Sequence, residues 1–167
     1  MSKHKFEKLA IEVGEMLMGL GFHLAIAESC TGGWVSEVVT SVSGSSNWFD
    51  RGFITYSNIA KYEMLDVPAK TIKDHGAVSE ETALAMANGA LNNSHAEVAL
   101  AVTGVAGPLG GSIEKPVGSV CFAWVTLEQH KILHKQFSGD RTQIREQAVE
   151  CSLLNLLSFL DKILQKQ

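Results

Sequence analysis

Apolar residues recur at helical spacing in separate stretches along the chain. Between residues 4 and 20 they fall at positions i, i+3, i+4 and i+7, which predicts an amphipathic helix ending at Gly19 and Gly21. Further helical segments are expected from Trp34 to near Ser43, from Asn58 (as the cap) through Leu65, after Pro68, from Ser79 to about Asn92 and after Asp140. The last segment carries an apolar stripe that we expect to face the core, formed by Ile144, Ala148, Cys151, Leu154, Leu157 and Leu160.

Between the helical segments lie shorter runs with the composition of β-strands. Continuous apolar runs predict buried strands, and β-branched and aromatic residues predict others. The expected strands cover residues 22–27, 48–56 and 96–103, and a β-hairpin is expected over 117–126 and 131–137. Helices that flank several buried strands and one hairpin indicate an α/β fold, a layered α/β/α domain with a mixed β-sheet flanked by helices.

Length, charge and cysteine content narrow the class of protein. The 167 residues suit a single domain over 1–167, and 46% hydrophobic with 19% charged residues is typical of a soluble globular protein. The net charge of −4 argues against nucleic acid or an anionic membrane as the main partner and leaves room for a local basic pocket that binds a small anion. No stretch is apolar enough to span a bilayer, and Glu12 and Glu15 interrupt any secretory signal. The 3 widely spaced cysteines predict reduced thiols and a cytoplasmic location.

A serine stands where the first predicted strand passes into a helix. The turn Ala27–Gly33 would expose the Ser29 hydroxyl at the end of the sheet and direct backbone N–H groups and the positive helix end toward a ligand. Gly32 and Gly33 permit a close approach of that ligand to the backbone. The alternative is that a hydroxyl in this turn only caps the helix, for which Thr31 is the expected residue. From this turn alone, capping and chemistry both remain open.

Serine becomes a strong nucleophile only when a base removes its proton. The six histidines lie outside the glycine-rich turns, and His130 and His134 lack a third metal ligand, so no metal site is expected. A desolvated lysine is the alternative base, and Lys61 lies one turn into the helix after the strand that ends at Tyr56. Both residues approach Ser29 if the two strands are parallel. Otherwise Lys61 is a solvated helix residue and Tyr56 a hydrogen-bonded core edge.

A glycine- and proline-rich loop follows the strand that ends at Thr103. Backbone N–H groups between Thr103 and Gly107 are placed to donate to an anion or an oxyanion, unless the loop is an ordinary surface turn. Lys115 follows this loop, either as a phosphate partner or as a solvated side chain.

Two arginines stand where a helix disfavours them. Arg141 lies in a first helical turn, where the dipole repels cations, and Arg145 shares its face one turn later. Each penalty is only a few tenths of a kcal/mol, roughly, so a tolerant surface explains the pair too. An anionic ligand would turn both penalties into binding energy, which makes the two arginines candidate phosphate ligands.

Six motifs occur together and in an order that identifies a resemblance. The chain resembles the CinA C-terminal domain family, which includes nicotinamide-nucleotide amidohydrolases, over nearly its whole length. The motifs that carry the resemblance are AESCTGG, FITYSNIAK, HGAVSEE, TGVAGPLGG, EKPVGSV and FSGDRTQIR. The resemblance implies hydrolysis of the carboxamide of nicotinamide mononucleotide to nicotinic acid mononucleotide and ammonia, in pyridine nucleotide salvage. It implies no cofactor and a stand-alone form of the domain.

The resemblance also assigns roles to residues. It implies that Ser29 is the nucleophile and that Tyr56 and Lys61 activate it. The expected substrate-binding residues combine the two glycine-rich turns with the two arginines: Cys30, Thr31, Gly32, Gly33, Thr103, Gly104, Ala106, Gly107, Arg141 and Arg145. The family commonly has an acidic residue where this chain has Leu109, so weaker substrate binding is one expectation.

Two other classes of function compete with the enzyme. A catalytically silent nucleotide-binding or regulatory paralogue would keep the glycine turns and the arginines without using Ser29. A partner-binding domain would use the apolar C-terminal helix, which is also the surface expected to support a homo-oligomer. The presence of Ser29, Tyr56 and Lys61 together favours the enzyme.

Overall fold

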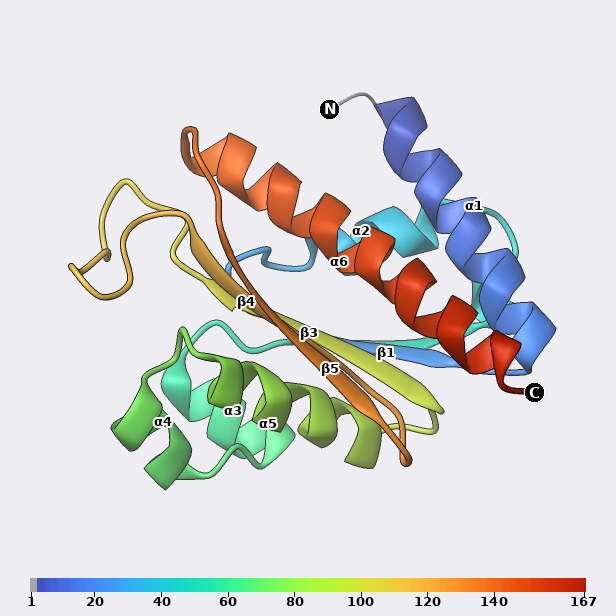
Figure 1. Ribbon diagram of the computed structural model, residues 1–167, viewed down its shortest axis with the longest axis horizontal. Coiled ribbons are helices and arrows are strands. Elements are labelled where there is room, and N and C mark those ends of the chain that lie inside the picture. The colour runs from blue at the N-terminus through green and yellow to red at the C-terminus, as the bar shows by residue number, and fades with distance from the viewer. Residues whose placement is uncertain (1–2) are drawn as a thin grey trace.

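The computed structural model describes residues 3–167 and shows two helical layers enclosing one β-sheet (Figure 1). The sheet has five strands in the order β2-β1-β3-β4-β5. Within the described residues the elements are α1 (Lys3–Leu20), β1 (Leu24–Glu28), α2 (Trp34–Thr40), η1 (Ser45–Asn47), β2 (Phe49–Ile54), α3 (Asn58–Leu65), α4 (Ala69–His75), α5 (Glu80–Asn92), β3 (Val98–Gly104), β4 (Ser119–Val125), β5 (His130–Gln136) and α6 (Arg141–Gln165). The predicted layered α/β/α fold is confirmed.

The sheet is mixed, as expected, and its direction changes at one position. Strand β1 pairs in parallel with both β2 and β3, whereas β4 is antiparallel to β3 and to β5. Glu28 at the end of β1 stands opposite Ile54 of β2 and Val102 of β3. The residues that follow β1 and β2 therefore leave the sheet at the same edge as the end of β3. This meets the condition on which the approach of Lys61 to Ser29 depended.

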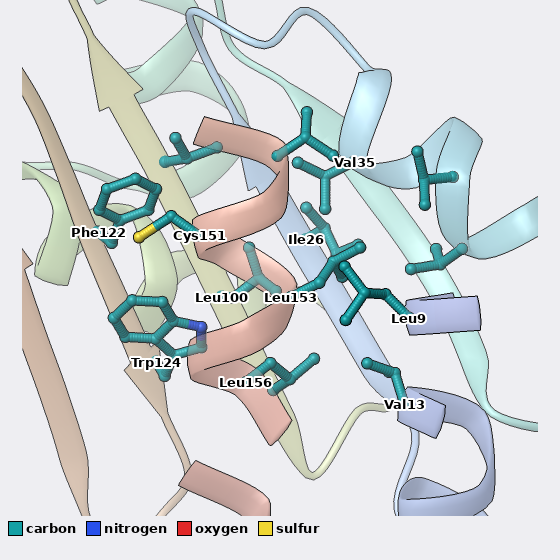
Figure 2. Packing of buried hydrophobic residues seen from close by; sticks show 14 of the residues in the cluster. Leu9, Val13, Ile26, Val35, Leu100, Phe122, Trp124, Cys151, Leu153 and Leu156 are labelled. Atoms are coloured by element: carbon teal, nitrogen blue, oxygen red, sulfur yellow. The ribbon is translucent and has the colours of Figure 1, made fainter. Parts of the chain in front are cut away.

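The two faces of the sheet carry side chains of different size. In Figure 1, α1, α2 and α6 cover one face, and α3, α4 and α5 cover the other. Large residues such as Ile26, Leu100 and Leu153 fill the first face (Figure 2). Alternate positions of β1 and β3 carry alanines on the second face, among them Ala25 and Ala99, which allow α5 to pack close to the sheet. Both faces of β1 are buried, which explains its continuous apolar run.

Three local expectations were wrong. Helix α2 ends at Thr40 and not near residue 43. The cap of α3 is Ser57, whose hydroxyl accepts the N–H of Ala60 at 3.0 Å, and not Asn58. Leu154 is 46% exposed, because α6 turns a neighbouring face of the helix, with Leu153 and Leu156, toward the sheet and α1. The expected start of α6 after Asp140 is confirmed by a capping box with Gln143.

Candidate active site

A cavity of about 280 Å³ opens at the carboxyl ends of the parallel strands. Ligands in open α/β sheets bind at this edge. Its lining combines residues from both predicted glycine-rich turns with others: Ser29, Cys30, Tyr56, Asn58, Lys61, Ala77, Val78, Thr103, Gly104, Val105, Ala106, Gly107, Leu109, Gly110 and Arg141. A larger cavity of about 590 Å³, near Phe22 and Leu127, lies at the other edge of the sheet and contains none of the predicted site residues.

A serine and a lysine meet in the wall of this cavity. The Nζ of Lys61 lies 3.2 Å from Ser29 Oγ, to which it donates, and also donates to the carbonyl oxygen of Thr55 at 2.8 Å. Lys61 is only 1% exposed, so its interpretation as a solvated helix residue was wrong. Burial lowers the pKa of Lys61 below its ordinary value. No carboxylate forms an ion pair with it within residues 3–167. These conditions favour a lysine that can accept a proton.

The turn that carries Ser29 is held by the residue before it. Glu28 is fully buried, and its carboxylate accepts the hydroxyls of Thr31 at 2.6 Å and of Ser36 at 2.7 Å. It also accepts the backbone N–H groups of Gly33, Val35 and Ser36 at 3.2, 2.9 and 3.0 Å. The expectation that Thr31 caps α2 was therefore wrong, because the Glu28 carboxylate satisfies the first N–H groups of that helix.

This arrangement also corrects the expected anion site at the start of α2. The carboxylate of Glu28 binds the first N–H groups of α2, and no residue of that helix lines the cavity. The Ser29 hydroxyl does not cap this helix, and it accepts a hydrogen bond from Lys61 Nζ. One signal in the sequence pointed to Glu28, since it is the only charged residue at the end of an otherwise apolar run. A charge in such a position is stable only with partners.

One backbone N–H beside Ser29, that of Cys30, has the sulfur of its own side chain as its partner. The N–H of Ser29 donates to the carbonyl of Val102 at 3.0 Å, and the N–H of Gly32 donates to the carbonyl of Ser29 at 3.0 Å. The N–H of Cys30 has no oxygen acceptor in the part of the chain that the structure describes. Cys30 lines the cavity, so this N–H is a candidate oxyanion donor. Burial raises the pKa of the Cys30 thiol to about 12, which disfavours the reactive thiolate.

Tyr56 and Arg141 form a bridge at the entrance of the cavity. Arg141 donates to the hydroxyl of Tyr56 at 3.0 Å and to the carbonyl of Gly107 at 2.7 Å. Tyr56 is 61% exposed, so its interpretation as a core-edge residue was wrong. Among the described residues, no hydrogen bond joins Tyr56 to Ser29 or to Lys61. The structure thus groups Tyr56 with Arg141 at the entrance.

Arg145 lies behind the Ser29 turn and outside the cavity lining. It donates to the carbonyls of Cys30 at 3.1 Å and of Thr31 at 3.0 Å, and its guanidinium lies 5.3 Å from the centre of the Trp34 ring. Thr31, Gly32 and Gly33 also lie outside the lining. Protein carbonyls therefore account for the position of this cation without an anionic ligand.

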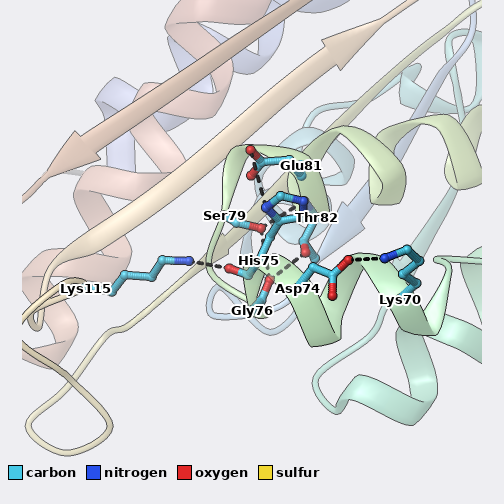
Figure 3. Close-up of polar contacts among 8 residues, drawn as sticks. All are labelled: Lys70, Asp74, His75, Gly76, Ser79, Glu81, Thr82 and Lys115. Atoms are coloured by element: carbon cyan, nitrogen blue, oxygen red, sulfur yellow. Dashed lines mark hydrogen bonds and ion pairs between the residues drawn. The ribbon is translucent and has the colours of Figure 1, made fainter.

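The opposite wall of the cavity rests on the segment after α4, which belongs to the HGAVSEE motif but was given no role in the site by the sequence reasoning. The Gly76 carbonyl accepts the hydroxyls of Ser79 at 2.9 Å and Thr82 at 2.6 Å, and the Thr103 hydroxyl donates to the Ala77 carbonyl at 2.8 Å. Lys115 donates to the carbonyl of His75 at 2.6 Å (Figure 3). Lys115 thus anchors the glycine-rich loop to α4 and does not line the cavity.

Within the described residues, no group of three or more His, Cys, Asp or Glu side chains is arranged to hold a metal ion. In the same part of the chain, no helix combines the length and the hydropathy that crossing a bilayer requires.

The Glu28 carboxylate gives the first prediction. We expect Glu28→Gln to lower the free energy of unfolding by about 3 kcal/mol, because an amide offers one acceptor and opposes its own N–H donors to those of α2. Urea denaturation followed by circular dichroism measures the change. The matched control is Glu37→Gln on the exposed side of the same helix turn, for which roughly 0.3 kcal/mol is expected. Equal effects of the two substitutions would contradict the role given to Glu28.

Comparisons with known proteins point to one family. The model of the CinA C-terminal domain matches residues 6–160. The nicotinamide-nucleotide amidohydrolase PncC of Escherichia coli K12 is 47% identical over 157 residues, which are 93% of this chain and 95% of that protein. A CinA-like protein of Syntrophobacter fumaroxidans is 53% identical over 148 residues, and the match covers 89% of this chain but only 35% of that relative.

Solved structures agree with the fold. The competence/damage inducible protein CihA of Agrobacterium tumefaciens superposes with a TM-score of 0.87 at 45% identity, covering 93% of this chain and 95% of the other. A CinA superfamily protein of Klebsiella pneumoniae superposes with a TM-score of 0.91 at 34% identity, covering 94% and 98%.

Proposed function

The chain belongs to the CinA C-terminal domain family, and from this we propose that it is a nicotinamide-nucleotide amidohydrolase with Ser29 as its nucleophile. The reaction would convert nicotinamide mononucleotide to nicotinic acid mononucleotide and ammonia, a step of pyridine nucleotide salvage. The observation that carries the proposal is the buried contact of 3.2 Å between Lys61 Nζ and Ser29 Oγ. A similar relative, which this chain matches over 95% of its length, carries the name of this activity.

The first half of the reaction forms an acyl-enzyme. Neutral Lys61 accepts the Ser29 proton while Ser29 Oγ attacks the carboxamide carbon. The N–H of Cys30 donates to the oxyanion of the tetrahedral intermediate, an interaction type worth roughly 3 kcal/mol per donor. The C–N bond then breaks, and protonated Lys61 returns the proton to the leaving ammonia. The positive pyridinium ring of the substrate makes its carboxamide carbon more electrophilic.

The second half releases the acid. A water molecule gives a proton to Lys61 and attacks the acyl carbon, the bond to Ser29 Oγ breaks, and Ser29 recovers the proton. We assign Tyr56 to substrate binding with Arg141, because its hydroxyl meets the guanidinium and not the reacting serine. This differs from the activating role that the family resemblance implies for Tyr56.

The charges that line the cavity fit an anionic nucleotide. Arg141 is the cation at its entrance, and no carboxylate belongs to the lining residues. A phosphate group would meet Arg141 at the entrance, where a guanidinium binds two oxygens at once. Leu109, which is 85% exposed, replaces the usual acidic residue and adds neither charge nor a polar contact. This replacement favours the alternative of a silent nucleotide-binding paralogue.

Incubation of the purified protein with nicotinamide mononucleotide separates the two functions. Ammonia and nicotinic acid mononucleotide in equal amounts support the enzyme, whereas calorimetric binding without either product supports the silent paralogue. Nicotinamide riboside, which lacks the phosphate, is the matched substrate control. A cytoplasmic location and a homo-oligomer remain predictions from the sequence.

A further inference from the structure

Arg145 joins two segments that are far apart in the sequence. Its side chain leaves α6 and reaches the turn after Ser29, 115 residues earlier in the chain. There the Nε donates to the carbonyl of Cys30 and the Nη2 to the carbonyl of Thr31. The guanidinium also lies over the ring of Trp34, the first residue of α2. A planar fork with parallel donors fixes both carbonyls at once.

Arg145 and the turn itself together fix the backbone around the N–H of Cys30, which has no oxygen acceptor among the described residues. The peptide unit that carries the N–H of Cys30 also carries the carbonyl of Ser29, which accepts the N–H of Gly32. The next unit carries the Cys30 carbonyl, which Arg145 holds. Both peptide units around Cys30 are therefore fixed, one by the turn itself and one by α6. A donor must be set in this way before reaction if it is to stabilise an oxyanion.

Position relative to the cavity separates Arg145 from the other arginine of the helix. Both arginines donate to two protein oxygens, but Arg141 lines the cavity whereas Arg145 lies outside the lining. We propose that Arg145 is a positioning residue for amide hydrolysis, which holds the N–H of Cys30 toward the oxyanion, and is not a ligand of the substrate phosphate. This inference rests on the proposed function.

Steady-state kinetics of ammonia release distinguish the roles. We expect Arg145→Gln to lower kcat by about 30-fold, less than the loss of an entire oxyanion donor, with KM for nicotinamide mononucleotide within about 2-fold of its original value. Arg145→Lys keeps the charge and one carbonyl contact, so it recovers part of kcat. Arg141→Gln is expected to show the reverse, a raised KM with kcat retained. Arg51→Gln, on the edge strand beside Asp50, is the control for loss of an arginine.

A second readout does not depend on the nucleotide. A fluorophosphonate is attacked by Ser29 Oγ, so that an O–P bond forms, the P–F bond breaks, fluoride leaves and Lys61 takes the proton. We expect Arg145→Gln to slow labelling of Ser29 about as much as it lowers kcat, with thermal unfolding monitored in parallel. A raised KM with unchanged kcat and labelling rate would overturn the positioning role. A lowered melting temperature with unchanged kcat and labelling rate would overturn it too. Wild-type protein that is labelled at Ser29 but releases no ammonia refutes the proposed function, while the labelling rates still decide the role of Arg145.

Discussion

Ser29→Ala is expected to lower ammonia release from nicotinamide mononucleotide by at least about 10⁴-fold, because the alanine offers no oxygen to attack the carboxamide carbon. Binding of the nucleotide should change little, since Arg141 and the glycine-rich loop remain in place. Initial rates of ammonia formation measure the first quantity, and isothermal calorimetry with the same preparation measures the second. A covalent mechanism also predicts an acyl adduct on Ser29 in the unsubstituted protein, visible by mass spectrometry after rapid acid quenching.

Ser43→Ala is the matched control for Ser29→Ala, because this serine is exposed and lies beyond the end of α2. Its turnover should equal that of the original protein. Substantial turnover by Ser29→Ala would disprove covalent catalysis and leave direct attack by water. If Ser29→Ala loses both nucleotide binding and turnover, the hydroxyl binds the substrate and does not attack it.

Lys61→Met should lower kcat by about 10³-fold, because the buried Ser29 hydroxyl then has no base. Lys61→Arg should be as inactive, since a guanidinium stays protonated and cannot accept the serine proton. The two substitutions differ in charge and agree in outcome only if proton transfer is the function of Lys61. Lys73→Met, in the last turn of α4, is the control for loss of a lysine outside the cavity.

The pH dependence has a definite sign. Burial lowers the pKa of Lys61, so this amine loses its proton at a lower pH than an exposed lysine does. With the neutral amine as the proposed base, kcat/KM should rise with pH through the lowered pKa of Lys61 and level off above it. A rate that falls as pH increases over this range would exclude Lys61 as the general base. The profile is recorded from initial rates of ammonia release at constant ionic strength.

The sequence predicts most of the fold because the pattern of β1 and β3 reflects burial on both faces. Continuous apolar runs followed by glycine-rich turns indicate parallel strands whose ends meet, and this brought Ser29 and Lys61 together in the prediction. The wrong prediction that Leu154 is buried also comes from reading the pattern of apolar residues. Helical period identifies an apolar face, but which of two neighbouring faces is buried depends on α1, and no local pattern contains that contact.

The hydrogen-bond partners of individual site residues were harder to predict than the fold. Glu28 stands in the motif beside Ser29, yet composition and spacing do not show that its carboxylate would replace Thr31 as the cap of α2. The unfavourable positions of Arg141 and Arg145 did signal unusual partners. The sequence could not show that Arg141 lies at the cavity entrance while Arg145 binds two main-chain carbonyls. Both arginines contact residues far earlier in the chain, and no local pattern reveals such contacts.

The packing of α6 against α1 has a consequence for synthesis on the ribosome. Figure 1 shows these two helices side by side on one face of the sheet, although they come from opposite ends of the sequence. The nascent chain therefore emerges with the apolar side of α1 uncovered, and with the Ser29 turn lacking Arg145, until the segment from Arg141 onward has been made. We infer that this domain completes its fold only after α6 has left the ribosome, and that nascent chains stalled before α6 would bind chaperones and lack the finished site.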